Sequence, residues 1–266
     1  MTLPPVPESF YWAQASCGTV LTCRPLEASV PHVFTTRELQ LSSPDDWRRV
    51  ATALGVNAVV TLDQVHGAEV VAIRRGSPRP SGRDTADVLV SDDPDVAVAV
   101  RAADCVPLLL ADPATGAVAA VHAGWRGTAA GAATAAVQAL GREFGAKPEH
   151  LVAAIGPSIG ACCYEVGSEL VDRFAAAGHA RYLIQRWFVS PPPRRDGRCG
   201  LRPPAPPALR LDLAVANRDQ LMLAGVPEQH IHACGLCTAM HLDVLTSYRA
   251  EREQAGRLAG VIRARG

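Results

Sequence analysis

The sequence has little lysine, few aromatic residues and no net charge. Arginine supplies 25 of the 26 basic residues, Lys147 is the only lysine, and the acidic residues also number 26. A balance of zero argues against a nucleic-acid-binding surface, which normally shows a basic excess. The preference for arginine, together with much alanine and proline, indicates the coding bias of a GC-rich genome rather than a chemical requirement.

Long apolar runs and nucleotide-binding loops are also missing. No apolar stretch approaches the ~18 residues of a membrane span, so no membrane partner is expected. Residues 1–7 show no basic region followed by an apolar one, which excludes a signal peptide. Neither a Walker-type loop nor a G-x-G-x-x-G sequence is present. We therefore expect a cytoplasmic protein whose eight cysteines are thiols or metal ligands rather than disulfides.

Apolar residues make up 48% of the 266 residues, which is enough for a sizeable core. Strand-like runs and helical patterns predict one α+β domain over residues 1–266. The expected strands are 32–36, 58–62, 69–73, 87–91, 96–101, 106–111, 117–122, 151–155 and 231–234, the last paired with residues near 244–248. Helices are expected at 45–54, 128–144, 167–177 and 211–224. The Pro-rich segment 190–207 is expected to be a surface loop.

Two strand ends carry the residues with the clearest chemistry. The runs 107–111 and 117–121 are joined by Asp-Pro-Ala-Thr-Gly, a sequence typical of a turn. A chain that reverses there brings Cys105 and His122 close together, and His66 lies upstream beside another apolar run. One thiolate and two imidazoles suit zinc with its fourth position open. The alternative is a buried thiol with two ordinary histidines.

Other cysteines offer rival arrangements. Cys234 and Cys237, with histidines at 230, 232 and 241, imitate a zinc knuckle or a redox pair, but we favour buried thiols on a strand and turn. Cys162 and Cys163 are adjacent, so in an extended chain they point to opposite sides. We expect those two to serve packing rather than to share a metal.

Anion-binding groups are suggested at two places. Residues 124–128 lead into an Ala-rich helix, whose free N–H groups could hold an anion with help from Arg126. The alternative there is a tight turn with Trp125 in the core. Arg249 near the C-terminus offers a further guanidinium group.

Several longer motifs resemble the YfiH-like family, which is also called the laccase-domain, polyphenol oxidase or peptidoglycan editing factor family. They are Gln64–Gly67, Ala86–Asp87, Ala103–Pro107, His122–Gly127, Ile155–Val166 and Ser247–Arg249. The resemblance implies layered β-sheets with flanking helices, and it implies that His66, Cys105 and His122 ligate a metal. The implied activity is a zinc-dependent phosphorolysis of adenosine, inosine and S-methyl-5′-thioadenosine, together with adenosine deamination. The older family label is a copper phenol oxidase, so Cu²⁺ is a second candidate cofactor.

The sequence departs from the family pattern beside two arginines. The family's Gly-rich loop after the Phe-Thr-Thr-Arg sequence that ends at Arg37 is replaced by Glu-Leu-Gln-Leu, and the family's Ser-Tyr-Arg-Arg-Asp becomes Ser-Tyr-Arg-Ala-Glu around Arg249. We take Arg249, Arg37 and Arg126 as candidates for binding phosphate. Asp104, next to Cys105, is expected to orient a histidine or to move protons. The oligomeric state is not predicted.

Three functions are therefore considered. The first is a zinc enzyme acting on purine nucleosides with phosphate as partner. The second is copper-dependent phenol oxidation, which is less favoured because multicopper sites use many His-X-His pairs and this chain has one, at 230–232. The third is an editing hydrolase in which Cys105, activated by a histidine, attacks a peptidoglycan precursor.

Overall fold

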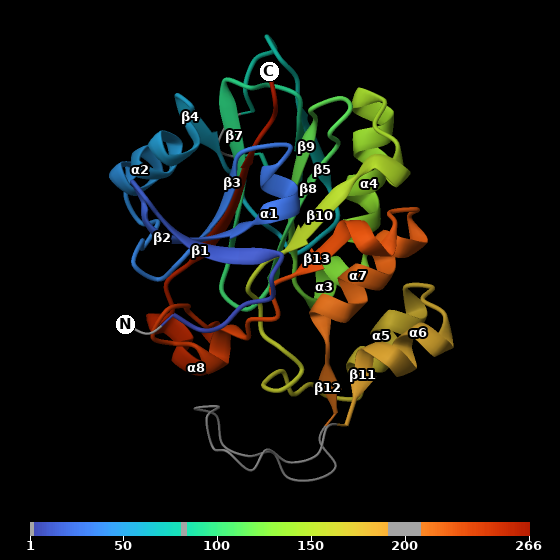
Figure 1. The fold of residues 1–266 in the computed structure, drawn as a ribbon. Helices are drawn as coiled ribbons and strands as arrows, with labels where there is room; N and C mark the ends of the chain where they lie inside the picture. Colours follow the sequence, from blue (N-terminus) through green and yellow to red (C-terminus); the bar gives the residue numbers. More distant parts are fainter. Residues whose placement is uncertain (1–2, 81–83, 191–208) are drawn as a thin grey trace.

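Two six-stranded sheets form the framework of the computed structural model, which describes residues 3–80, 84–190 and 209–266 (Figure 1). The first sheet runs in the order β1 (Phe10–Ala15), β2 (Gly18–Cys23), β3 (His32–Thr35), β14 (Leu258–Arg263), β7 (Val96–Ala102) and β4 (Ala58–Val60). The second runs in the order β13 (Ile231–Ala233), β10 (Val152–Ile155), β8 (Val106–Ala111), β9 (Val118–Ala123), β6 (Val88–Ser91) and β5 (Val70–Ile73). A two-stranded ribbon joins β11 (Phe188–Val189) to β12 (Arg210–Leu211).

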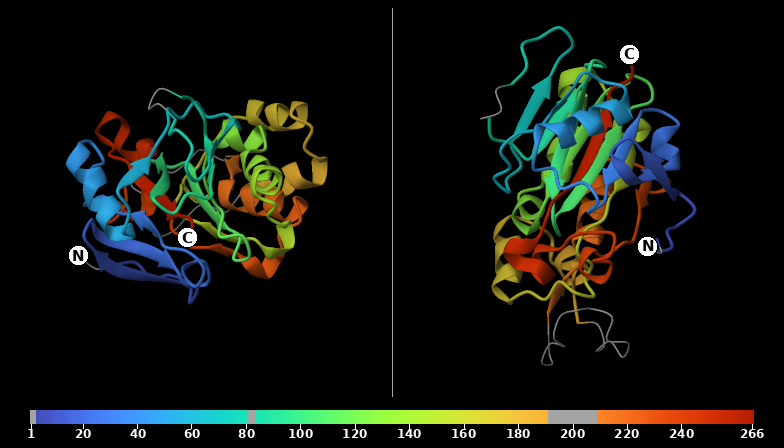
Figure 2. Two further views of the ribbon diagram at one scale, coloured as in Figure 1. Left: turned by 90° about the horizontal axis from the view of Figure 1, so that it is seen from above. Right: turned by 90° about the vertical axis from the view of Figure 1, so that its left-hand side faces the viewer.

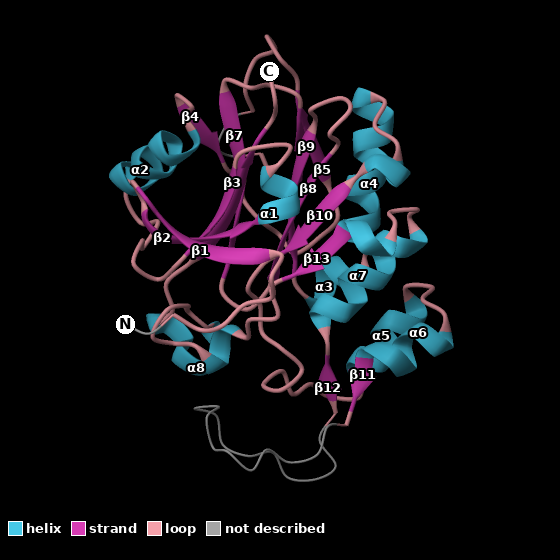
Figure 3. Cartoon of the chain, viewed as in Figure 1, coloured by secondary structure: helices cyan, strands magenta, loops and turns pink. Residues whose placement is uncertain are grey.

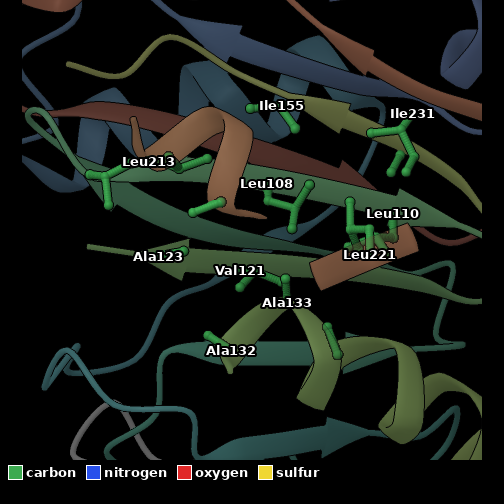
Figure 4. Packing of buried hydrophobic residues seen from close by; sticks show 14 of the residues in the cluster. Leu108, Leu110, Val121, Ala123, Ala132, Ala133, Ile155, Leu213, Leu221 and Ile231 are labelled. Carbon is green, nitrogen blue, oxygen red and sulfur yellow. The ribbon is translucent and has the colours of Figure 1, made fainter. Parts of the chain in front are cut away.

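The second sheet is buried on both faces, and strand β8 shows how. Successive side chains of a strand point to opposite sides. Leu108 and Leu110 accordingly enter the core beneath the helices (Figure 4), whereas Leu109 enters the core between the two sheets. A strand covered on both faces needs an unbroken apolar run, which explains the sequence of β8.

Helices complete the layers (Figures 2 and 3). Helices α3, α4 and α7 pack with the second sheet, and α2 packs on β4 and β7 of the first. The helices are α1 (Arg24–Glu27), α2 (Pro44–Leu54), α3 (Trp125–Ala129), α4 (Ala132–Phe144), α5 (Glu169–Ala176), α6 (Arg181–Trp187), α7 (Leu213–Leu223) and α8 (Tyr248–Glu251). None of the helices in the described residues has the length and hydropathy needed to cross a membrane. The architecture confirms the predicted α+β fold of layered sheets and flanking helices.

Most predicted helices are confirmed, with one correction. Helix α2 begins after Ser43, whose hydroxyl accepts from the Asp46 N–H while the Asp46 carboxylate accepts from the Ser43 N–H, a reciprocal cap. The helix predicted at 128–144 is two helices, because Gly131 takes a φ of +79° and breaks α3 from α4. The second helix nevertheless ends at Phe144, as predicted, with Gly145 as its cap.

The predicted strands are confirmed except at the C-terminal end. Residues 244–247 form no strand, and Tyr248 begins the short helix α8. Strand β13 pairs with β10 instead, in parallel register. The sequence analysis missed β1, β2, β11 and β12, and it also missed β14, which pairs with both β3 and β7 in the middle of the first sheet. The predicted Pro-rich loop at 190–207 falls, apart from residue 190, outside the described residues.

Candidate metal centre and active site

The hairpin of β8 and β9 brings Cys105 and His122 to the same end of the second sheet. Pro107 lies opposite His122 in the antiparallel register, and Cys105 is the second residue before Pro107. The hairpin closes through the Asp112 N–H, which donates to the Ala117 carbonyl at 2.9 Å. The predicted strand, turn and returning strand are therefore confirmed.

His66 comes from the loop between β4 and β5, and its backbone is held in an unusual conformation. Its φ is +63°, in the left-handed region that residues other than glycine rarely adopt. The Asp87 carboxylate accepts hydrogen bonds from three successive N–H groups, those of Val65 at 3.1 Å, His66 at 3.0 Å and Gly67 at 2.7 Å. These bonds offset the conformational cost and fix where the His66 ring is presented.

The same carboxylate also orients the second histidine. His122 Nδ1 lies 2.7 Å from Asp87 Oδ1, and both side chains are buried. Because Nδ1 is engaged, Nε2 is the nitrogen left to serve as a ligand, an arrangement typical of metal-binding histidines. The pKa of Asp87 is lowered: burial raises it, but the hydrogen bonds from His122 and from the loop N–H groups outweigh burial. One buried acid thus organises both imidazoles.

The electrostatics of the three side chains favour a thiolate. Burial raises the pKa of Cys105, but hydrogen bonds and positive charge from His122 and His66 outweigh it and bring the pKa to about 7. Burial lowers the pKa of His122, but Asp87 and Cys105 raise it to about 9. A thiolate next to an imidazolium is therefore the stable pair when no cation is bound.

The donor atoms of His66, Cys105 and His122 all lie within 4.8 Å of one another. The two imidazole rings are 4.9 Å apart between centroids and inclined by 73°. Gly124 makes room for this convergence, since a Cβ there would lie 2.6 Å from Cys105 Sγ and 3.3 Å from His66 Cδ2. Two nitrogens and one sulfur suit a zinc ion with an open fourth position. The residues present therefore fit a catalytic metal.

The three side chains open into a cavity of about 870 Å³. Its walls carry five arginines against two acids, and three aromatic side chains. The lining residues besides His66, Cys105 and His122 are Asp63, Gln64, Arg101, Ala102, Ala103, Asp104, Trp125, Arg126, Tyr164, Tyr248, Arg249, Arg252 and Arg257. The excess of guanidinium groups makes the cavity electropositive, which suits an anionic co-substrate.

The predicted phosphate-binding arginines are not all in this cavity. Arg249 lines it, with its guanidinium 4.9 Å from the centroid of the Tyr164 ring and Nη1 donating to the Glu165 carbonyl at 2.8 Å. Arg126 also lines it and stacks on Trp125 at 4.5 Å. Arg37 is not among the lining residues.

The guanidinium of Arg37 is engaged elsewhere. It pairs with Glu251 at 3.0 Å and also donates to the Leu242 carbonyl. It therefore joins the loop after β3 to the segment around α8, and a role for Arg37 in binding substrate stays a prediction.

Asp104 needs a correction as well. Its carboxylate accepts from Thr238 Oγ1 at 2.6 Å and from the Arg249 N–H at 2.6 Å, so it holds the wall of the cavity. The side chain that orients a histidine is Asp87, not Asp104. A role for Asp104 in proton movement stays a prediction.

Sequence reasoning missed Asp87 and Tyr164, although both lie within the motifs that carry the family resemblance. Asp87 directly precedes β6, whose four residues are all buried. A carboxylate next to such a strand must be buried too and so must have partners. An acidic residue directly before an apolar run is the sequence feature that points to Asp87 as a buried hydrogen-bond acceptor.

Cys234 and Cys237 are both buried, as expected, but they are not grouped with each other. Cys234 is buried between the two sheets, where burial raises its pKa to about 12, and it joins no ligand group among the described residues. Cys237 instead meets Cys162 and Cys163, with the three sulfurs within 4.8 Å. The expectation that Cys162 and Cys163 point apart is wrong, because Cys163 and Tyr164 both donate to the Gly160 carbonyl and the segment forms a turn.

Layered sheets with two histidines and one cysteine at the edge of an arginine-lined cavity are consistent with a class of enzymes. The family model described as "Multi-copper polyphenol oxidoreductase laccase" matches residues 34–265, and the chain belongs to this laccase-domain family.

Curated relatives carry enzyme names. The chain is 36% identical over 254 residues to a protein of Deinococcus radiodurans named purine nucleoside phosphorylase, covering 88% of this chain and 89% of that one. It is 38% identical to purine nucleoside phosphorylase SCO2081 of Streptomyces coelicolor, covering 80% and 78%. A protein of an unknown prokaryotic organism named adenosine deaminase RL5 is 39% identical, covering 54% and 49%.

Solved structures share the fold. YlmD from Geobacillus stearothermophilus superposes with a TM-score of 0.77 at 30% identity, covering 98% of this chain and all of that one. The hypothetical protein YfiH from Bacillus licheniformis superposes with a TM-score of 0.79 at 27% identity, covering 95% and 97%. The protein is therefore a member of an enzyme family whose relatives are named for purine nucleoside chemistry.

Proposed function

We propose that this protein is a zinc-dependent purine nucleoside phosphorylase that acts on adenosine, inosine and S-methyl-5′-thioadenosine and also deaminates adenosine. The observation that carries the proposal is the convergence of His66, Cys105 and His122 at the edge of a cavity with five arginines. The names of the relatives support the substrate class. The cavity volume, about 870 Å³, lies within the range of small-molecule sites.

His66, Cys105 and His122 would hold the zinc ion, with Asp87 fixing the orientation of His122. When bound, zinc supplies a Lewis acid that polarises a substrate group or a water molecule. Gly124 keeps the approach to the three donors open, since a side chain there would collide with Cys105.

Phosphate would be held by the arginines. In phosphorolysis a phosphate oxygen forms a bond to the anomeric carbon of the ribose while the bond from that carbon to the base breaks, giving free base and ribose 1-phosphate. Arg249 is the best-placed residue, because the Tyr164 ring and the Glu165 carbonyl hold its guanidinium at the cavity wall. Arg126 faces the same cavity from α3. Deamination instead consumes water and releases ammonia, so it does not need these groups.

The purine ring would lie against aromatic side chains. Trp125, Tyr164 and Tyr248 all line the cavity, and Tyr248 is 49% exposed, which leaves its face available to a ligand. Aromatic faces bind planar bases with little dependence on substituents. This arrangement suits an enzyme that accepts several purine nucleosides.

A thiol-based hydrolase is the second candidate. Burial raises the pKa of Cys105, but His122 and His66 outweigh burial and bring this pKa to about 7. A nucleophilic thiolate would attack a peptidoglycan precursor and keep its activity after chelation. Copper-dependent phenol oxidation has the family description in its favour, but the described residues hold one His-containing donor group.

The test is incubation of metal-defined protein with inosine and with adenosine, with and without phosphate, with the products separated by chromatography. We expect hypoxanthine and ribose 1-phosphate from inosine only when phosphate is present. From adenosine we expect inosine without phosphate, and adenine and hypoxanthine in addition when phosphate is present. Base release without phosphate would make the enzyme a hydrolase. Absence of both products in zinc-loaded protein would overturn the nucleoside proposal, and oxidation of a phenol only by copper-loaded protein would replace it.

A further inference from the structure

We propose that Cys162, Cys163 and Cys237 form a second metal site, which takes a thiophilic d¹⁰ ion and fastens the wall of the active-site cavity. Their three sulfurs lie within 4.8 Å of one another, and none of the three is in a disulfide. Sulfurs that share one ion at about 2.3 Å lie about 4 Å apart. Small adjustments of side-chain rotamers therefore suffice to bind an ion.

A backbone N–H donor and a buried guanidinium lie close to the cluster. The Gly160 N–H donates to Cys237 Sγ at 3.3 Å, and Gly160 has no side chain to hold the thiols off, since a Cβ would lie 3.2 Å from Cys162 Sγ. Arg210 is only 5% exposed, and its Nη1 donates to the Cys162 carbonyl at 2.5 Å. A buried guanidinium next to the cluster compensates for the negative charge that thiolates bring.

Arg210 adds a second observation close to the cluster. Its Nε is buried and has no hydrogen-bond partner within residues 3–80, 84–190 and 209–266. A buried donor without a partner is costly unless charge nearby makes up for it. A metal–thiolate group beside the guanidinium would supply that charge.

The cluster is sheltered from solvent, because Cys163 and Cys237 are both buried. Each thiol that binds the ion releases its proton to solvent. Cys162 is partly exposed, unlike its two partners, and so provides the path of entry.

The number of donors indicates which ion. Structural zinc sites close with four protein ligands, and the cluster supplies three within the described part of the chain. Soft thiolates select Cu⁺ and Zn²⁺ among the biological metals. Three sulfurs without a fourth ligand favour Cu⁺, and Zn²⁺ is the competing occupant.

The position of the cluster gives the ion a role. Cys162 and Cys163 precede Tyr164, which lines the cavity, and Cys237 precedes Thr238, which donates to Asp104. Backbone bonds join the two segments, because Thr238 donates to the Ser158 carbonyl at 3.0 Å and Ile159 donates to the Asp104 carbonyl at 2.9 Å. An ion shared by both segments would hold Tyr164 and Asp104 in register behind the substrate.

The experiment isolates this cluster in a Cys105→Ala protein, in which the first centre has lost its sulfur. That protein is titrated anaerobically with Cu⁺ in the presence of a chromophoric Cu⁺ chelator, and in a separate arm with Zn²⁺. We expect about one equivalent of Cu⁺, an ultraviolet thiolate-to-copper absorption band, and a raised thermal unfolding temperature. Adding Cys237→Ser or, in a second protein, Cys163→Ser should remove all three signals.

Cys17→Ser in the same background is the matched control, because Cys17 is 1% exposed and lies in a different core cluster. It should keep the bound equivalent, which separates the loss of a ligand from the loss of a buried thiol. Zn²⁺ that displaces Cu⁺ at one equivalent would support the site and assign it to zinc. No binding in the Cys105→Ala protein, equal binding after Cys237→Ser, or a disulfide within the cluster found by mass spectrometry of the untreated protein would overturn the proposal. None of these results depends on whether nucleosides are substrates.

Discussion

Two groups of side chains that could bind a metal lie at the same end of the second sheet, and their surroundings differ. The His66–Cys105–His122 centre is charged and faces a cavity, and a buried acid orients it. The thiol cluster of Cys162, Cys163 and Cys237 is mostly buried and is tied to backbone groups. A catalytic metal site has ligands oriented by a carboxylate and keeps one coordination position open to substrate. A buried group of thiols is typical of a structural metal site.

The largest effect that tests this contrast is removal of Cys105. Cys105→Ala should lower bound zinc from about one equivalent to none at the first centre and abolish both phosphorolysis and deamination. Metal analysis and product chromatography on the same sample check this. If activity disappeared while stoichiometric zinc remained on His66 and His122, Cys105 would be a nucleophile rather than a ligand. Full activity in the variant would remove this centre from the chemistry altogether.

Asp87→Asn tests whether the buried carboxylate, which the thiol cluster lacks, is needed for metal binding at the His66–Cys105–His122 centre. The change keeps the size of the side chain but weakens its bonds to His122 and to the loop of His66, so zinc affinity and kcat/KM should fall by about 10- to 100-fold. Asp93→Asn is the matched control, since Asp93 is also a buried acid and accepts only from a turn, at the Asp95 N–H. Equal losses in both variants would mean that Asp87 acts through stability alone.

Arg249→Lys separates the two proposed reactions. Lysine keeps the charge but loses the planar fork that binds phosphate in a bidentate manner, so phosphorolysis should fall by about tenfold, mainly through the KM for phosphate. Deamination of adenosine needs no phosphate and should change little. Arg142→Lys, on the exposed side of α4, provides the control for a simple loss of arginine. Parallel losses in the two reactions would argue that the Arg249 side chain holds the cavity wall, through the Tyr164 ring and the Glu165 carbonyl, and does not bind the phosphate.

The last effect concerns stability rather than activity, at a buried histidine remote from the metal chemistry. Burial lowers the pKa of His32 from 6.5 to about 4, and its Nε2 accepts from the Cys23 N–H at 2.9 Å. The folded protein therefore keeps His32 neutral while the unfolded chain takes up a proton below pH 6.5. Stability from this residue is complete above pH 6.5 and is lost as the pH falls toward 4, by about 3 kcal/mol at the limit.

Urea unfolding of the wild type and of His32→Gln between pH 7 and pH 4.5 measures this contribution. The wild type should lose stability more steeply than the variant, because glutamine can donate and accept without titrating. Parallel curves would show that other groups, such as Asp87, carry the whole acid dependence.

The sequence was informative where local patterns decide the structure. Apolar runs separated by Pro and Gly predicted the hairpin of β8 and β9, and with it the meeting of Cys105 and His122. The resemblance to the family predicted the third ligand. What local patterns could not show was the pairing of distant segments: Asp87 reaches the loop of His66, and Thr238 reaches Asp104, across long stretches of chain.

Two incorrect predictions arose because local sequence patterns do not show how distant segments pack. Cys162 and Cys163 were expected to diverge because an extended chain was assumed, and a turn held by the Gly160 carbonyl brings them together. Strand β14 was missed because its Ala-Gly start resembles a loop. Gly260 is required there by a close approach, since a Cβ would lie 3.0 Å from Pro107 Cβ and 3.2 Å from the Phe34 ring. Only the packing of the two sheets reveals that requirement.

The place of β14 has a consequence for how the protein is made. The strand lies between β3 and β7 and pairs with both. It is encoded more than a hundred residues after either of them, so one edge of each strand has no partner until β14 is made. On the ribosome, residues 32–35 can pair with β2 and residues 96–102 with β4, but the other edge of each strand has no native partner until residues 258–263 have been synthesised. Unpaired edges of this kind attract other chains. Protection of nascent chains by a holding chaperone should therefore matter more to the yield of this protein than the stability of its finished fold.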